Sequence, residues 1–220
     1  MHGPAGDVIL KTLASDFFIA YPCAGRKREY SPGTGGKTMK KRGALSPGKT
    51  KPKILDTGEG KMEPKLHFRY AERKDTPLIL RFIRELADYE KMLNEVVADE
   101  ATLEEWIFDK EKAEVIFACL DDKEIGFALF FHNFSTFLGR AGLYLEDLYD
   151  LPEYRGNGYG KAILKKLAAI AVERKCGRLE WWCLDWNKPS IDFYLSLGAE
   201  AMCDWTVYRI SGETLTKLAK

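Results

Sequence analysis

Three glycines alternate with larger residues between an arginine and a lysine in the stretch Y-R-G-N-G-Y-G-K, Tyr154 to Lys161. Glycines this close together let the backbone bend sharply and bring its N–H groups near a ligand. A helix is expected to follow, and the positive end of its dipole would favour an anion at the same place. With Arg155 and Lys161 adding positive charge, the stretch predicts a diphosphate site; the alternative is an ordinary tight connection.

Two familiar phosphate loops do not fit this stretch. A Walker A loop ending at Lys161 would need a glycine at 155 and a hydroxyl at 162, where the chain has arginine and alanine. A dinucleotide fingerprint would run G-x-G-x-x-G, whereas the glycines here are Gly156, Gly158 and Gly160. The loop therefore belongs to neither class.

A second chemical feature is the pair Glu146 and Asp147, which lies between Leu145 and Leu148 on an otherwise apolar stretch expected to be a strand. Such carboxylates could take a proton from a substrate, because their neighbours are not those of a solvated face. They could also be polar residues at a strand end. In a regular strand Leu145 and Asp147 point away from Glu146, and a β-bulge would change that alternation.

Further carboxylates, Glu85, Asp88 and Glu90, are expected on a helix early in the folded region. Residues 62–220 have 22 Lys and Arg against 28 Asp and Glu, so the region is acidic and would steer a cationic substrate toward itself. The helix carboxylates could equally form a solvated face.

The elements that must position these groups are expected in the order β-α-α-β-β-β-α-β-α-β. Hydrophobic periodicity predicts helices at 76–92, 101–108, 161–175 and 190–197, and strands at 66–70, 115–120, 125–134, 142–148, 179–184 and 206–210. Asp75 is expected to cap the first helix. The glycine loop then joins a strand to the longest of the later helices.

The first 61 residues differ in composition from the rest. They carry 12 Lys and Arg against 5 Asp and Glu, and from residue 25 onward they are rich in Gly, Pro, Ser, Thr and Lys. Such a segment buries too little to offset its ordering entropy, so we expect a disordered basic extension at 1–61. It could bind nucleic acid, but no aromatic residues are interleaved with its basic ones, so a segment without catalytic role is favoured.

No apolar run approaches the roughly 20 residues of a membrane span, and the chain start lacks the pattern of a secretory signal. These features predict a cytoplasmic protein. The five cysteines include no C-x-x-C pair, so reduced core thiols are expected rather than disulfides or a metal site.

The loop R-G-N-G-Y-G, Arg155 to Gly160, resembles the R/Q-x-x-G-x-G/A acetyl-CoA loop of the GCN5-related N-acetyltransferases (GNAT). The stretches I-R-E-L-A-D-Y-E at 83–90, L-Y-L-E-D at 143–147 and L-D-W-N-K-P-S-I-D-F-Y-L-S-L-G at 184–198 resemble the diamine acetyltransferase branch, which includes the spermidine/spermine and thialysine enzymes. The resemblance covers 62–220. It implies an α/β fold in which helices flank a mixed central sheet, and a homodimer.

The resemblance also implies site residues. Glu146 would act on the amine as general base through a water, Tyr194 would protonate the CoA thiolate, and the Leu148 N–H would serve the oxyanion. Residues implied for acetyl-CoA are Leu148, Arg155, Gly156, Asn157, Gly158, Tyr159, Gly160, Lys161, Asn187, Ser190 and Tyr194. Residues implied for the amine are Glu85, Glu90, Glu146, Asp147 and Trp186.

The acceptor stays open at this point. A primary amine of a small cationic molecule, lysine-like or polyamine, is the first hypothesis, and Leu184 to Asn187 looks closer to the thialysine enzymes. Phe137 stands where the spermidine/spermine enzymes carry a tryptophan. Acetylation of a protein lysine or N-terminus, and a noncatalytic acyl-CoA-binding module, are the alternatives.

Overall fold

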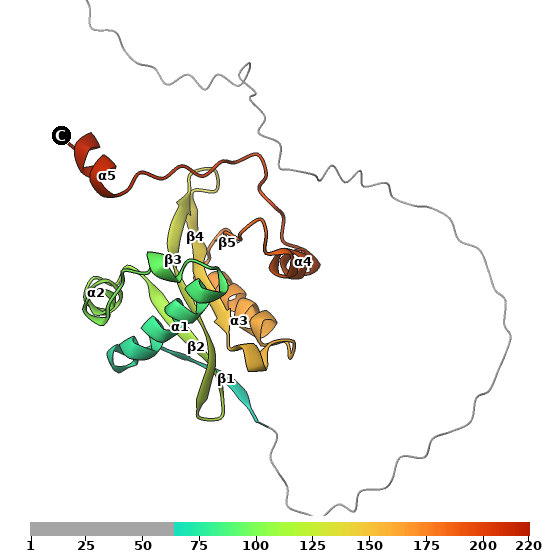
Figure 1. Ribbon diagram of the computed structural model, residues 1–220. Helices are drawn as coiled ribbons and strands as arrows, with labels where there is room; N and C mark the ends of the chain where they lie inside the picture. Colours follow the sequence, from blue (N-terminus) through green and yellow to red (C-terminus); the bar gives the residue numbers. More distant parts are fainter. Residues whose placement is uncertain (1–63) are drawn as a thin grey trace, which may run out of the picture. The chain divides into compact units, whose positions relative to one another are not determined.

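The computed structural model describes residues 64–220, so the expected basic extension at 1–61 lies outside the described residues (Figure 1). The described chain divides into a main unit that ends at Leu197 and a segment from Gly198 to Lys220. That segment contains one helix, α5 (Gly212–Leu218). Within residues 64–220, no helix combines the length and apolar character needed to cross a bilayer.

The main unit is built on a five-stranded sheet whose strands lie in the order of the sequence. The first four strands pair antiparallel and the last pair, β4 and β5, is parallel, which makes the sheet mixed, as predicted. The strands are β1 (Leu66–Tyr70), β2 (Glu114–Leu120), β3 (Lys123–Ser135), β4 (Arg140–Asp150) and β5 (Leu179–Trp181).

Helices cover both faces of this sheet (Figure 1). On one face lies α1 (Thr76–Tyr89), and on the other lies α3 (Tyr159–Glu173), which connects the parallel pair. The remaining helical elements are 3₁₀ turns at Arg73–Asp75, Leu93–Glu95 and Pro152–Tyr154, α2 (Glu100–Glu104), which continues into a π-helical turn at Glu105–Asp109, and α4 (Lys188–Ser196).

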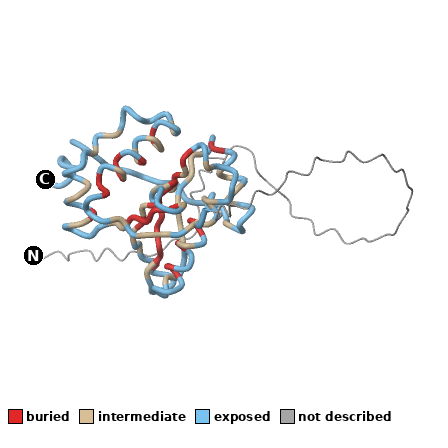
Figure 2. Tube along the Cα trace, turned by 90° about the horizontal axis from the view of Figure 1, so that it is seen from below, coloured by how far each residue is buried: buried red, intermediate tan, exposed pale blue. Residues whose placement is uncertain are grey.

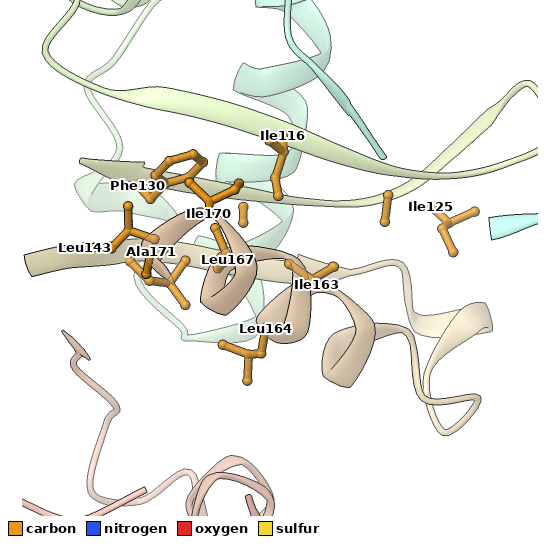
Figure 3. Close-up of a cluster of buried hydrophobic side chains, with 12 residues drawn as sticks. Ile116, Ile125, Phe130, Leu143, Ile163, Leu164, Leu167, Ile170 and Ala171 are labelled. Atoms are coloured by element: carbon orange, nitrogen blue, oxygen red, sulfur yellow. The ribbon is translucent and has the colours of Figure 1, made fainter. Parts of the chain in front are cut away.

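Two hydrophobic clusters hold the layers together, and the buried stretches gather inside the main unit (Figure 2). On the α3 face, Ile163, Leu167 and Ile170 of the helix belong to one buried cluster with Phe130 and Leu143 of the sheet, and Ile170 lies beside Phe130 (Figure 3). Because these helix positions recur every three or four residues, α3 presents one apolar stripe, as its periodicity predicted.

The opposite cluster packs α1 against the sheet through Ile79 and Phe82, which meet Phe117, Phe127 and Tyr149. The strand β2 and the first half of β3 are mostly buried because both of their faces are covered. The sheet is therefore a rigid central layer with an α1 side and an α3 side.

Two predicted strands were wrong in part or whole. The segment 206–210 has no strand and is exposed, because alternation alone does not form a strand without a paired neighbour. The strand predicted at 179–184 ends at Trp181, where its pairing with β4 stops.

Asp75 occupies the N-cap position of α1, as predicted, but it does not cap the helix through its side chain. Its side chain makes no cap hydrogen bond and instead accepts from the Arg69 guanidinium at 2.6 and 3.0 Å. This contact holds the pKa of Asp75 below its usual value. A core thiol is confirmed at Cys119, whereas Cys203 is exposed.

We expect Gly126→Ala in β3 to lower the free energy of unfolding by about 1–3 kcal/mol. A Cβ there would lie 2.6 Å from the Tyr149 carbonyl oxygen, a backbone atom that the sheet holds in place. Urea unfolding measures the loss. Gly177→Ala is the matched control, since its Cβ would meet only side-chain atoms of Leu138 and Arg140, and an equal loss in both variants would contradict this explanation.

Candidate active site

A β-bulge lies in β4 at Glu146. Leu145 is paired with Phe130 and Asp147 with the neighbouring Leu129, so Glu146 has no partner on β3. The bulge reverses the alternation of every later residue in the strand. Asp147 therefore shares the α1 side with Leu129, whereas an unbroken strand would have placed it with Leu145 on the α3 side.

The two parallel strands separate at the same point. Pairing between β4 and β5 ends with Leu145 opposite Trp181. The Leu151 N–H bonds to Ile125 on β3, so by alternation the Leu148 N–H projects from the other edge, where β5 is no longer paired. The bulge thus gives the gap beside β4 a backbone donor at Leu148 and a carboxylate at Asp147.

Three of the predicted carboxylates come together at this gap. Burial raises the pKa of Asp147 to about 7, with further contributions from the charges of Glu146 and Glu90. Burial also raises the pKa of Glu90, which follows the last turn of α1. Glu146 is exposed on the bulge, so Asp147 is the least solvated carboxylate of the bulge pair.

Glu85, predicted with this group, lies elsewhere. It forms an ion pair with Arg81 at 3.5 Å, and with Arg81 and Arg84 it lines a groove of about 410 Å³ beside α1. Burial raises the pKa of the Tyr149 hydroxyl, and the charge of Glu85 adds to that shift. Glu85 is absent from the charges that shift the pKa of Asp147.

The glycine loop forms an open backbone cradle. Gly156 and Gly158 have φ of 79° and 85°, in the left-handed region, and a Cβ on either would meet nothing within 4 Å. Gly158 is the N-cap of α3, whose first N–H groups have no partner within the helix. The loop folds back through Asn157, whose Nδ2 donates to the Tyr154 carbonyl at 3.0 Å. This cradle fits a diphosphate, with the exposed Lys161 in the first turn of α3.

Arg155, which the sequence suggested as a positive charge for the diphosphate, contacts β4 and α1. Its Nε donates to the Asp150 carbonyl at 3.0 Å, and its guanidinium lies 4.8 Å from the Tyr89 ring and 5.2 Å from the Tyr149 ring. The side chain therefore fastens the glycine loop to α1. Sequence reasoning missed this contact because Tyr89 and Arg155 are far apart in the chain.

Asp150 is a second group that the sequence did not single out. Its carboxyl lies between two glycines, since a Cβ on Gly126 or Gly160 would come within 2.8 or 2.9 Å of its oxygens. Burial raises its pKa to about 6, against the opposing effects of Arg155 and the Gly160 N–H. Its Oδ1 is buried without a hydrogen-bond partner among the residues that the structure describes.

Asn187 ties the end of α1 to the start of α4. Its Oδ1 accepts from the Ser190 N–H at 3.4 Å, which caps α4, and from the Tyr89 hydroxyl at 3.1 Å. Trp186 packs its ring 6.1 Å from that of Tyr89. Because the Asn187 oxygen is committed to these bonds, its NH₂ group is the part that could serve a ligand.

Tyr194 lies on α4 behind this cap. Its ring is 5.0 Å from that of Trp181 and packs on the α3-side cluster. Burial raises the pKa of its hydroxyl to about 12, and the neighbouring Cys183 and Glu90 add to the shift. The phenol therefore keeps its proton at neutral pH and can donate it. Within residues 64–220, no three His, Cys, Asp or Glu side chains could hold a metal ion.

Comparison with known proteins identifies a family with this arrangement of sheet and glycine loop. Residues 80–199 match the family model described as acetyltransferase (GNAT) family. The chain belongs to the GNAT family. Membership establishes it as an acetyl-CoA-dependent N-acetyltransferase and accounts for the mixed sheet that opens beside a glycine loop.

Relatives of this GNAT protein include proteins named for the acetylation of thialysine and of spermidine and spermine. The thialysine N-epsilon-acetyltransferase of Bos taurus is 38% identical over 163 residues, which cover 69% of this chain and 95% of that protein. The spermidine/spermine N(1)-acetyltransferase-like protein 1 of Homo sapiens is 34% identical over 165 residues, 69% of this chain and 23% of that protein. The predicted diamine acetyltransferase branch is thereby confirmed.

A solved structure shares the fold. An integron cassette protein from V. cholerae has a TM-score of 0.60 and 29% sequence identity, over 70% of this chain and 98% of that one.

We expect Asp150→Asn to stabilise the GNAT domain at pH 7.5 by up to about 3 kcal/mol, the value of about two pKa units. A folded-state pKa of about 6 means that the fold favours the protonated acid, so wild-type stability falls as pH rises from about 4 to 6.

Urea unfolding of wild type and variant from pH 4 to 7.5 measures this difference. It should shrink to below about 1 kcal/mol by pH 4, where the folded Asp150 is protonated and the unfolded carboxyl, with a pKa of about 3.9, is about half ionised. A stability difference that stays constant across this range would show that burial of the charge is not its cause.

Proposed function

We propose that this GNAT enzyme transfers the acetyl group of acetyl-CoA to the primary amine of a small cationic acceptor. The observation that carries the proposal is the bulge at Glu146, which sets an amine-binding carboxylate and a backbone donor at one gap in the sheet. Relatives named for thialysine and for spermidine/spermine acetylation support this acceptor class. Both names denote molecules with a primary amine.

Acetyl-CoA, when bound, supplies an activated acetyl group on a thiol leaving group. Its diphosphate would lie on the cradle from Gly156 to Gly160, with Lys161 beside it. The NH₂ of Asn187 and the region of Ser190 would hold its arm, since both lie at the start of α4. The Leu148 N–H would donate to the acetyl oxygen as negative charge develops there.

The acceptor amine must lose a proton before it can attack, because an alkylammonium has a pKa of about 10.4. We assign this role to Asp147, on the α1 side. Its pKa of about 7 matches a base that works at neutral pH, and Glu90 and Glu146 add negative charge that favours an ammonium. Glu146, exposed on the bulge, would bind the amine or a bridging water, and Trp186 would lie beside the acceptor.

Tyr194 would supply the proton that the departing thiolate needs. Its hydroxyl retains its proton because its pKa is raised to about 12, and α4 holds it on the side of the sheet where the glycine loop lies. The proposed base and acid therefore approach the gap from opposite faces of the sheet.

We expect kcat/KM to rise with pH through about 7 as Asp147 ionises, and to fall about tenfold per pH unit below that. Asp147→Asn should abolish this rise of kcat/KM with pH, the acidic limb of the profile, and should lower kcat/KM at least tenfold at pH 8. Glu146→Gln is the matched control and should keep the limb. A limb retained in Asp147→Asn and lost in Glu146→Gln would make Glu146 the base.

Release of CoA from acetyl-CoA tests the overall function, with thialysine, lysine, putrescine, spermidine, spermine and a lysine-containing peptide as acceptors. We expect turnover on at least one small amine, and Tyr194→Phe should lower kcat at least tenfold, about 1.4 kcal/mol of barrier. Thermal unfolding of the variant controls for folding. Turnover on the peptide alone would contradict the small-amine assignment.

A further inference from the structure

A group of polar side chains lies beyond the proposed amine site on the same side of the sheet. In β5, Leu179 and Trp181 pack on the α3-side cluster, so Glu180 projects to the α1 side by alternation, as does Arg178 just before the strand, which lies over Gly142. Arg178 Nη2 lies 3.0 Å from Glu180 Oε2, and Asn133 Nδ2 donates to the same oxygen at 2.7 Å. None of these residues takes part in the site described above.

The register fixes the distance of this group from Asp147. Tyr144 pairs with Glu180 across the parallel strands and with Phe131 across the antiparallel ones, whereas Asp147 pairs with Leu129. Asp147 and Glu180 are therefore two residues apart along the strand direction and one strand spacing apart across it. Together these offsets put their Cα atoms roughly 8 Å from each other. The four-carbon side chain of lysine is long enough to bridge a separation of this size.

Aromatic rings lie between Asp147 and the Arg178–Glu180 pair on this side of the sheet. The rings of Phe131 and Tyr144 lie 5.0 Å apart, and Trp182 meets Tyr144 edge-on at 5.9 Å. Trp182 is 57% exposed, so it presents a large apolar surface on this side. A hydrocarbon chain is the part of an amine that such a surface would bind.

Arg178 is held in place and still accessible. Its stem crosses Gly142, where a Cβ would lie 2.9 Å from Arg178 Cγ and 2.4 Å from Asn133 Oδ1. The side chains of Arg178 and Glu180 are 39% and 32% exposed. Because Arg178 forms one ion pair with Glu180, its other guanidinium N–H groups can donate to a carboxylate in the bidentate geometry that arginine favours.

The charges at this end match one kind of molecule. Arg178 and Glu180 offer a cation and an anion side by side, which complements the carboxylate and ammonium of an α-amino acid. A plain diamine would instead bring a second ammonium toward Arg178, at a like-charge cost.

Resting on the proposed function, we propose that Arg178 and Glu180 determine acceptor specificity by binding the α-amino-carboxylate head of an amino acid whose side-chain amine reaches Asp147. The hydrocarbon stem lies along Tyr144 and Trp182. The preferred acceptor is thus an amino acid with a terminal side-chain amine, not a polyamine.

L-lysine and cadaverine test this assignment, because they share the same chain and differ in the carboxylate. Calorimetric titration of each into the CoA-bound enzyme should show tighter binding of lysine to wild type. Arg178→Met should weaken lysine binding at least tenfold and leave cadaverine within twofold. Glu180→Gln should weaken lysine more than 6-aminohexanoate, which lacks the α-ammonium. Arg84→Met, an exposed arginine on α1, is the control and should change neither ligand.

Equal weakening of lysine and cadaverine in Arg178→Met, with CoA affinity unchanged, would overturn the proposal by leaving the pair only a structural role. Tighter binding of cadaverine than of lysine to wild type would overturn it as well. Since the readout is binding, these outcomes are separate from failure of acetyl transfer, which the CoA-release experiment detects.

Discussion

The bulge at Glu146 is the constraint on which the proposed site depends. One unpaired residue in β4 reverses the alternation of the strand, so Asp147 faces the α1 side and the Leu148 N–H faces the gap. The same point marks the end of pairing with β5. A regular strand would have kept the carboxylate on the α3 side, away from Glu90. The proposed base, Asp147, and the proposed acid, Tyr194, therefore lie on opposite faces of one sheet.

Burial of carboxyl groups around this gap has two different consequences. Asp147 is surrounded by other carboxylates, and its pKa of about 7 leaves it able to exchange a proton with an amine. Asp150, between Gly126 and Gly160, has a pKa of about 6 and an oxygen without a partner in the described part of the chain. The raised pKa of Asp147 suits proton transfer in a reaction. The raised pKa of Asp150 reflects a cost to folding, because β3, β4 and α3 approach closely around its carboxyl group.

Contacts among aromatic and polar side chains join the parts that surround the gap. Arg155 links the glycine loop to Tyr89 at the end of α1, and the Tyr89 hydroxyl reaches Asn187 at the start of α4. Tyr194 lies further along the same helix. These side-chain contacts connect the glycine loop, through the end of α1, to the start of the helix that carries the proposed general acid.

The sequence by itself determined the mixed sheet, the helix after the glycine loop and the family, because periodicity and short motifs are local properties. It also named Glu146, Asp147, Asn187 and Tyr194 as chemistry-bearing residues. Only the tertiary structure decided which carboxylate is buried, since pKa and side-chain direction depend on register and on neighbours distant in the chain. The bulge, the turn of Arg155 toward Tyr89 and the pairing of Arg178 with Glu180 all arise from such contacts, which no local pattern encodes.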